Sequence, residues 1–128
     1  MTWAEETSSF WIADQGNEEV IEVGSNGGGE LSSFAVNEAN PPRGIAWGAG
    51  RLWVATASHS GSNADVVSLY TTSGSRLEQV PVDAPDPGGM FPKGLLFDDD
   101  PTGPYLLMTD EGDDDGIHVY RIEGCEAL

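Results

Sequence analysis

The sequence predicts an all-β protein made of three similar units, each a small antiparallel sheet of four short strands, with the last unit incomplete. Short strings rich in β-branched and aromatic residues recur along the chain, and Gly, Pro, Asn, Asp or Ser bounds each of them, as is typical of strands. No long window keeps the apolar period of a helix, which is about 3.6 residues. The strings also recur in the same order, which indicates an internal repeat.

A central apolar string identifies each unit. The three copies share one shape and are Phe10–Asp14, Leu52–Thr56 and Leu106–Asp110. Their nearly continuous apolar character predicts strands that are covered on both faces. We therefore expect Trp11 and Trp53, the large residues of the first two copies, to lie in the core between units.

A second string precedes the central one. It reads Pro-basic-Gly followed by apolar residues in Pro42–Trp47 and Pro92–Phe97, and Thr2-Trp3 matches its end. This alignment places Trp3, Trp47 and Phe97 in register, and we expect them along the innermost strands. A stacking role toward a sugar requires these rings to be exposed.

Two further strings follow the central one. The third strings are Val20–Val23, Val67–Tyr70 and Ile117–Tyr120, and the fourth strings are Leu31–Val36 and Leu77–Val82. Four short strands in a unit of about 40 to 50 residues are typical of β-propeller blades. The sequence thus predicts a single domain of blades at approximately 2–41, 42–91 and 92–128. In the third blade we expect His118 on the polar face.

The strings resemble a known family. Phe-Trp-Ile-Ala-Asp-Gln-Gly-Asn at 10–17 and Pro-Arg-Gly-Ile-Ala-Trp at 42–47 are similar to the strand motifs of NHL-repeat and SMP-30/gluconolactonase-like propellers. The resemblance extends from Thr2 to about Gly124, and it weakens in the second unit. It implies blade architecture but no single function, because these families include lyases, lactonases, RNA binders and protein-binding scaffolds.

Three blades leave two apolar end faces, and such uncapped units associate. Closed propellers usually have about four to eight blades. Either the chain is a piece of a longer propeller, or copies assemble. Two copies would form a six-bladed ring, so we expect a homodimer, or another protein partner that completes the propeller.

The charge limits the partners further. With 22 acidic and 5 basic residues the net charge is −17, which repels nucleic acids and anionic membranes. Acidic residues are spread along the chain, as in a protein adapted to high salt. The alternatives are a charged binding face and a charge that serves solubility alone. No apolar run approaches the roughly 20 residues of a membrane span. No signal peptide is visible, so we expect a cytoplasmic protein or a part of an extracellular or virion assembly.

Acidic turns follow the central strings of the first and third units. By resemblance to the SMP-30-like family, Asp14, Asn17 and Asp110 are the candidate ligands of Ca²⁺ or another divalent cation. The alternative is a pair of solvated turns in which Asp and Asn support the hairpin through local hydrogen bonds.

Two insertions, 57–65 and 83–91, lengthen the second unit. Long loops on one face of a scaffold often carry recognition, so the candidate binding residues are His59, Asp86, Met90 and Phe91. We assign no catalytic residue, because one loop histidine beside serines does not make a triad. The expected function is a non-catalytic scaffold for protein–protein binding or assembly in a high-salt setting, such as a component of a virus particle. The alternative is a metal-dependent lactonase or lyase.

Overall fold

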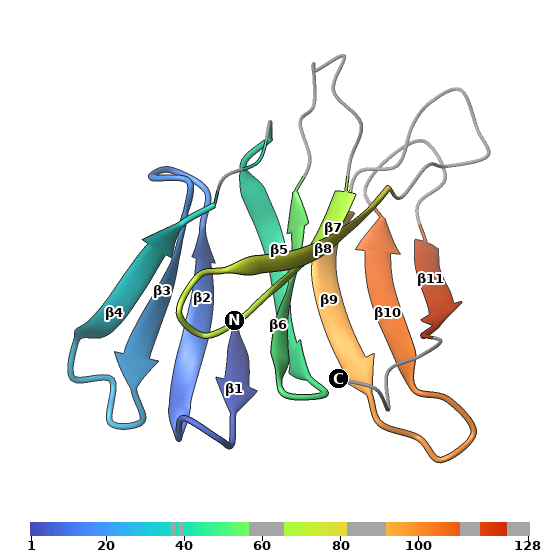
Figure 1. Ribbon diagram of the computed structural model, residues 1–128, viewed down its shortest axis with the longest axis horizontal. Helices are drawn as coiled ribbons and strands as arrows, with labels where there is room; N and C mark the ends of the chain where they lie inside the picture. Colours follow the sequence, from blue (N-terminus) through green and yellow to red (C-terminus); the bar gives the residue numbers. More distant parts are fainter. Residues whose placement is uncertain (37, 39, 57–65, 82–91, 111–115, 123–128) are drawn as a thin grey trace.

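The computed structural model describes residues 1–36, 38, 40–56, 66–81, 92–110 and 116–122, which form three antiparallel sheets that lie side by side (Figure 1). The first sheet has four strands in the order β1-β2-β3-β4, and the middle sheet has four in the order β5-β6-β7-β8. The third sheet has three, in the order β11-β10-β9. The all-β prediction with units of four, four and three strands is confirmed.

Every predicted string matches a strand, and the two fourth strings extend one residue past the ends of β4 and β8. The first sheet consists of β1 (Thr2–Ala4), β2 (Ser9–Asp14), β3 (Glu19–Gly24) and β4 (Glu30–Ala35). The middle sheet consists of β5 (Pro42–Gly48), β6 (Arg51–Thr56), β7 (Val66–Tyr70) and β8 (Arg76–Pro81). The third sheet consists of β9 (Pro92–Asp98), β10 (Tyr105–Asp110) and β11 (Gly116–Arg121). Each strand pairs with its neighbour in the chain, so every sheet is a meander and the connections inside it are hairpins.

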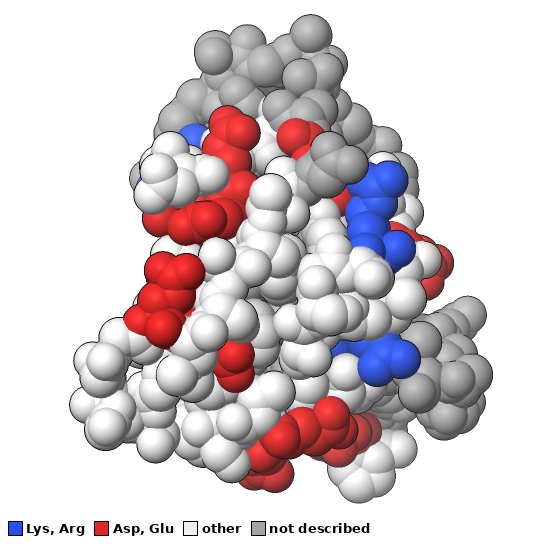
Figure 2. Space-filling model, turned by 60° about the vertical axis from the view of Figure 1, so that its left-hand side comes forward, with Lys and Arg blue, Asp and Glu red and all other residues white. Residues whose placement is uncertain are grey.

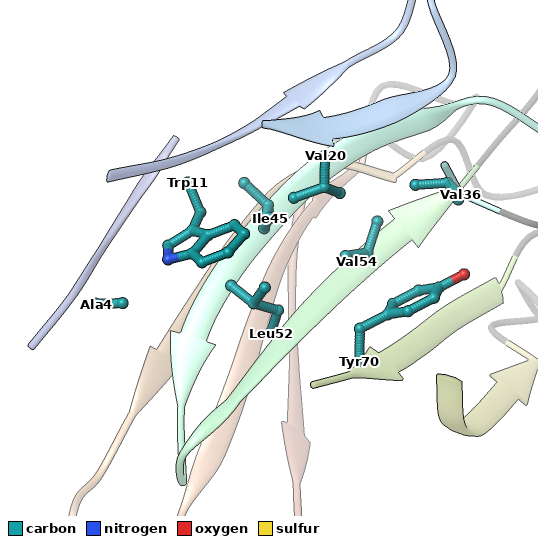
Figure 3. Close-up of a cluster of buried hydrophobic side chains, with 8 residues drawn as sticks. All are labelled: Ala4, Trp11, Val20, Val36, Ile45, Leu52, Val54 and Tyr70. Atoms are coloured by element: carbon teal, nitrogen blue, oxygen red, sulfur yellow. The ribbon is translucent and has the colours of Figure 1, made fainter. Parts of the chain in front are cut away.

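A buried cluster joins the first sheet to the middle sheet (Figure 3). Trp11 and Val20 from the first sheet meet Leu52, Val54 and Tyr70 from the middle sheet, and all five side chains are almost fully buried. The Trp11 indole donates a hydrogen bond of 3.1 Å to Thr7 Oγ1, so its polar edge is satisfied inside the core. Trp11 therefore packs between two sheets, as predicted.

A second cluster joins the middle sheet to the third. Trp53 of β6 is 7% exposed and packs with Leu69, while Leu106 and Met108 contribute from β10. Alternation along β6 explains how one strand serves both clusters, because Leu52 and Val54 face the first sheet and Trp53 and Ala55 face the third. The inner strands of the middle sheet are thus covered on both faces, while the outer strand β8 is exposed.

The glycine of the Pro-basic-Gly string permits close approach of β5 and β9. A Cβ atom on Gly44 would come within 2.5 Å of the carbonyl oxygen of Lys93, which is backbone and cannot move aside easily. On the other side, the backbone amide of Trp47 donates a hydrogen bond of 2.9 Å to Thr2 Oγ1 of β1. The strands β1, β5 and β9 therefore lie next to one another as the inner edge of the three sheets.

The described sheets form an open row and do not close on themselves. Contacts between sheets link the first to the middle and the middle to the third. The described residues contain no helix long and apolar enough to cross a membrane. The first and third sheets each keep one face that no other described sheet covers.

Candidate functional site: two apolar end faces and an aromatic pocket

The uncovered face of the first sheet is apolar. Trp11 faces the middle sheet, so its neighbours Phe10 and Ile12 project to the opposite side. Phe10 pairs with Trp3 on β1 and with Val23 on β3, which gives a row of three apolar side chains across the sheet. Trp3 is 40% exposed, and its ring meets Phe10 edge-on at a centroid distance of 4.9 Å. We call this row, with Ile12 and its partner Ile21, the first end face.

The uncovered face of the third sheet is also apolar. Leu107 of β10 pairs with Leu96 on β9 and with Val119 on β11, and these three residues with Ile117 form the second end face. Leu96, Val119 and Ile117 are 60%, 59% and 68% exposed. Such a contiguous exposed apolar surface is unusual for a monomer and marks an interaction site.

The second end face corrects one prediction. His118 was expected on the polar face of the third sheet, but its ring stacks with that of Tyr120, which packs against the core shared with the middle sheet. Because neighbouring residues of a strand face opposite sides, Ile117 and Val119 are left exposed instead. The outer side of the third sheet is thus the apolar one.

Charged side chains lie around one face of the molecule. Figure 2 brings the left-hand side of Figure 1 forward, and much of the middle of this surface carries no Lys, Arg, Asp or Glu. Carboxylates gather mainly along its left and lower parts, and most basic side chains in view lie on its right. A charged border of this kind is typical of the rim of a protein interface.

The three aligned aromatic residues line one pocket. Trp3, Trp47 and Phe97 are the penultimate residues of β1, β5 and β9, and they line an open pocket of about 260 Å³. Glu5 and Asp99 each lie one position beyond the end of the inner strand in their own sheet, and both line the same pocket. The pocket therefore combines three aromatic rings with two exposed carboxylates, and its lining includes no basic residue.

A tight turn forms the wall of the pocket. Ala49 and Gly50 connect β5 to β6, and both have positive φ, at 50° and 71°, as the two central residues of a type I′ hairpin turn require. Gly48, just before the turn, lies against the ring of Phe97. The pocket therefore lies where the turn at the end of β5 meets Phe97 of the third sheet.

Comparisons with known proteins inform the fold. No protein-family model matches the chain, and no curated protein matches it in sequence. Among solved structures, it is similar to the tail fiber of Staphylococcus aureus phage P68, with a TM-score of 0.60 and 16% sequence identity. The match shows a shared fold. It covers 98% of this chain and 29% of the tail fiber, so the chain spans less than a third of that protein.

The similarity to the tail fiber extends over all three sheets, since it covers nearly the whole chain. It supports the all-β architecture and adds no information on ligands at this identity. The resemblance to NHL-repeat and SMP-30-like propellers continues to rest on the strand motifs alone.

The structure places two of the three predicted metal ligands, Asp14 and Asn17, in one turn, and the third, Asp110, in another sheet. Asp14 lies at the end of β2 in the first sheet and Asp110 at the end of β10 in the third, with the middle sheet between them. Asp14 Oδ1 accepts hydrogen bonds from the backbone amides of Gly16 and Asn17, at 2.9 and 3.2 Å. Its Oδ2 accepts a third, of 2.9 Å, from the Asn17 side chain. These bonds lower the pKa of Asp14, with the Asn17 side chain contributing most.

The turn after β2 thus has the local Asp and Asn hydrogen bonds that were expected of a solvated turn, the alternative to a metal site. Among the residues that the structure describes, no three His, Cys, Asp or Glu side chains gather closely enough to hold a metal ion. A site that includes 111–115 remains a prediction, because those positions lie outside the described residues. So do the candidate binding residues His59, Asp86, Met90 and Phe91.

One buried carboxylate was not anticipated from the sequence. Glu38 lies between β4 and β5, and its side chain is only 2% exposed. It accepts hydrogen bonds from Ser68 Oγ at 2.8 Å and Tyr70 Oη at 2.7 Å, and it pairs with Arg76 Nη1 at 3.1 Å. Gln79 Nε2 donates another hydrogen bond to it. Through these hydrogen bonds and the ion pair, Glu38 links the connection between the first two sheets to β7 and β8.

Sequence reasoning also missed Glu5 and Asp99. Aligning the units on their aromatic residues gives the signal, because both carboxylates follow two positions after the aligned ring. The middle unit has Ala49 at the equivalent place. A search for repeated acidic residues beside repeated aromatic ones would have found them.

Proposed function

We propose that the chain is a non-catalytic assembly module whose three sheets are β-propeller blades, at approximately 2–41, 42–91 and 92–128 of one domain. Two copies would pair head to tail into a six-bladed ring. The observation that carries the proposal is the pair of apolar end faces, because each repeats a surface that is already used inside the molecule.

The contact between the middle and third sheets shows how two neighbouring units pack, and the proposed contact between copies follows the same arrangement. A row of the middle sheet, Ala46–Trp53–Leu69, packs against a row of the third sheet, Phe97–Leu106–Tyr120. Both rows cross three strands, and both belong to one buried cluster.

The end faces repeat the two sides of this contact. When the units are aligned on their central strings, Leu96–Leu107–Val119 of the second end face corresponds to the row Ala46–Trp53–Leu69. In the same alignment, Trp3–Phe10–Val23 of the first end face corresponds to the row Phe97–Leu106–Tyr120. The second end face of one copy is therefore matched to the first end face of another, in the same way as two neighbouring sheets of one chain.

Head-to-tail contacts either close into a ring or continue into a filament. Closed propellers usually have about four to eight blades, and two chains of three sheets fall within that range. A two-fold ring also covers both end faces of both copies. This agreement favours a closed homodimer over an open filament.

The proposed setting is a virus particle or a comparable surface assembly at high salt. The similarity to a phage tail fiber over 98% of the chain supports a structural role in a virion, and the net charge of −17 supports adaptation to salt. A scaffold needs only the surfaces described above. The alternative of a metal-dependent lactonase or lyase has no observation in its favour among the described residues.

The test is the molar mass in solution at molar salt, measured by light scattering after size-exclusion chromatography. We expect twice the 13.5 kDa of the chain for the unaltered protein. Ile117→Lys places a charge in the second end face and should give a monomer that keeps its β-type circular dichroism. Leu77→Lys is the matched control, because Leu77 is exposed on the outer strand β8 and lies outside both end faces. A stable monomer of the unaltered protein would contradict the proposal.

A further inference from the structure

The pocket at the ends of the inner strands has the composition of a cation site. We propose that it binds a small organic cation that carries a quaternary or alkylated ammonium group. Every lining residue belongs to the one chain described, and one of them, Trp3, also belongs to the first end face, so in the proposed ring a second copy would lie beside the pocket.

The aromatic rings provide the first part of the argument. The faces of tryptophan and phenylalanine carry partial negative charge and attract a cation within about 6 Å of the ring centre. Trp3, Trp47 and Phe97 line the pocket from three neighbouring strands, so a bound group lies next to three aromatic side chains. Trp3 is held edge-on against Phe10, and Phe97 lies at 5.6 Å from Trp53, so two of the three rings are fixed by other rings.

The carboxylates provide the second part. Glu5 and Asp99 are both exposed at the pocket, where they attract positive charge and repel anions. A neutral sugar could stack on the rings as well, but two carboxylates without any basic residue beside them favour a cation. The overall charge of −17 acts in the same direction at low salt and is screened at high salt.

The size of the cavity limits the ligand. Its volume of about 260 Å³ corresponds to roughly eight or nine water molecules, since one water occupies about 30 Å³. Ligand pockets for drug-sized molecules begin at about 300 Å³, so this cavity suits a smaller group. A trimethylammonium group with a short tail meets both the size and the charge of the pocket. A hydrated inorganic ion would gain little from three aromatic faces.

The experiment is a titration of the full chain with choline, followed by the indole signals of Trp3 and Trp47 in nuclear magnetic resonance spectra. The key comparison uses the neutral isostere of choline, in which a tert-butyl group replaces the trimethylammonium group. We expect saturable shifts with choline and much weaker ones with the isostere. Equal binding of the two compounds, or no binding of choline, would overturn the proposal, and so would tighter binding of glucose.

Variants of the lining residues test how much the carboxylates and the Trp3 ring contribute to choline binding. Glu5→Gln and Asp99→Asn change exposed residues, and each should weaken choline binding by about twofold to fivefold. Trp3→Ala should weaken it to a similar degree. Glu78→Gln removes one exposed carboxylate from the outer strand β8 and is the matched control, with no expected effect on affinity.

Equal affinity in Glu5→Gln, Asp99→Asn and the control would overturn the assignment of the carboxylates. The Ile117→Lys monomer distinguishes this proposal from the proposed ring. It should still bind choline, because Ile117 does not line the pocket and the lining residues all belong to one chain. Loss of choline binding in that monomer would show that the pocket needs a second copy and would overturn the assignment to one chain.

Discussion

The ring of Phe97 lies directly against the Cα of Gly48, at a distance that leaves no room for a Cβ atom. The backbone carbonyl of Gly48 also accepts a hydrogen bond of 3.0 Å from the indole of Trp53. Trp53 and Phe97 are themselves in ring contact. One glycine thus fixes two aromatic residues that join the middle sheet to the third sheet, and one of them, Phe97, also lines the pocket.

The first prediction follows from this contact. Gly48→Ala should lower the free energy of unfolding by about 1–3 kcal/mol, because the added methyl group overlaps the Phe97 ring and must displace it. Urea unfolding followed by circular dichroism measures the change. Gly16→Ala is the control, since a Cβ atom there meets no atom closer than 3.5 Å, and its effect should stay within about 0.5 kcal/mol. Equal stability of the two variants would contradict the packing described here.

The contact also shows what the sequence could and could not predict. The strands could be predicted because each is a short apolar run between turn residues, which is a local property of the sequence. The three units could be predicted because these runs repeat in the same order. That Phe97 packs on Gly48 depends on how two sheets approach each other, which no single string contains. The pocket carboxylates Glu5 and Asp99 fall in turns, where exposed acidic residues are common in this chain and gave no contrast.

The same limit explains the error at His118. Alternation along β11 defines two sides of the strand, but it does not say which side meets the neighbouring sheet. The usual rule buries the apolar side. Here the core uses Tyr120, and Ile117 and Val119 remain exposed, as expected for a surface that a partner covers.

The second prediction concerns Glu38. Glu38→Ala should lower the free energy of unfolding by about 2–3 kcal/mol, because it leaves the buried hydroxyls of Ser68 and Tyr70 without their acceptor. Arg76 adds less, since its side chain is 43% exposed and water can replace its partner. Thermal and urea unfolding measure the effect. Glu30→Ala, on the exposed strand β4, is the control and should change stability little. If Glu38→Ala lowers the free energy of unfolding as little as the control does, the contacts of Glu38 do not stabilise the fold.

The third prediction is a pH dependence that originates in the turn after β2. Hydrogen bonds from the Asn17 side chain, then from the backbone amides of Asn17 and Gly16, lower the pKa of Asp14 below 3.8. A carboxylate with a lowered pKa in the folded state favours folding above its unfolded-state pKa. That contribution is lost as the pH falls through the folded-state pKa.

Asp14→Asn removes the titrating group, so its stability should fall less steeply than that of the unaltered protein as the pH is lowered below 3.8. Unfolding midpoints measured at several acidic pH values test this. Glu30→Gln controls for the loss of one exposed negative charge. Identical pH profiles for Asp14→Asn and the unaltered protein would show that the turn does not contribute to acid sensitivity.

The fourth prediction concerns salt. Charges at a net −17 repel one another across the molecule when the Debye length is about 30 Å, at 0.01 M salt, and hardly at all when it is about 3 Å, at 1 M. The melting temperature should therefore rise with sodium chloride. A gain of about 1 kcal/mol corresponds to roughly 2–8 °C at this chain length.

Charge variants show whether screening causes that rise. Neutralising three exposed carboxylates together, through Glu30→Gln, Glu78→Gln and Asp98→Asn, should raise the melting temperature at low salt and flatten its dependence on salt. The charge-retaining pair Glu30→Asp and Glu78→Asp should behave like the unaltered protein. If neutralisation leaves the salt dependence unchanged, the stabilisation comes from salt acting on apolar burial rather than from relief of repulsion. Because the end faces are apolar, the same salt increase should then also strengthen dimer formation, and light scattering separates the two effects.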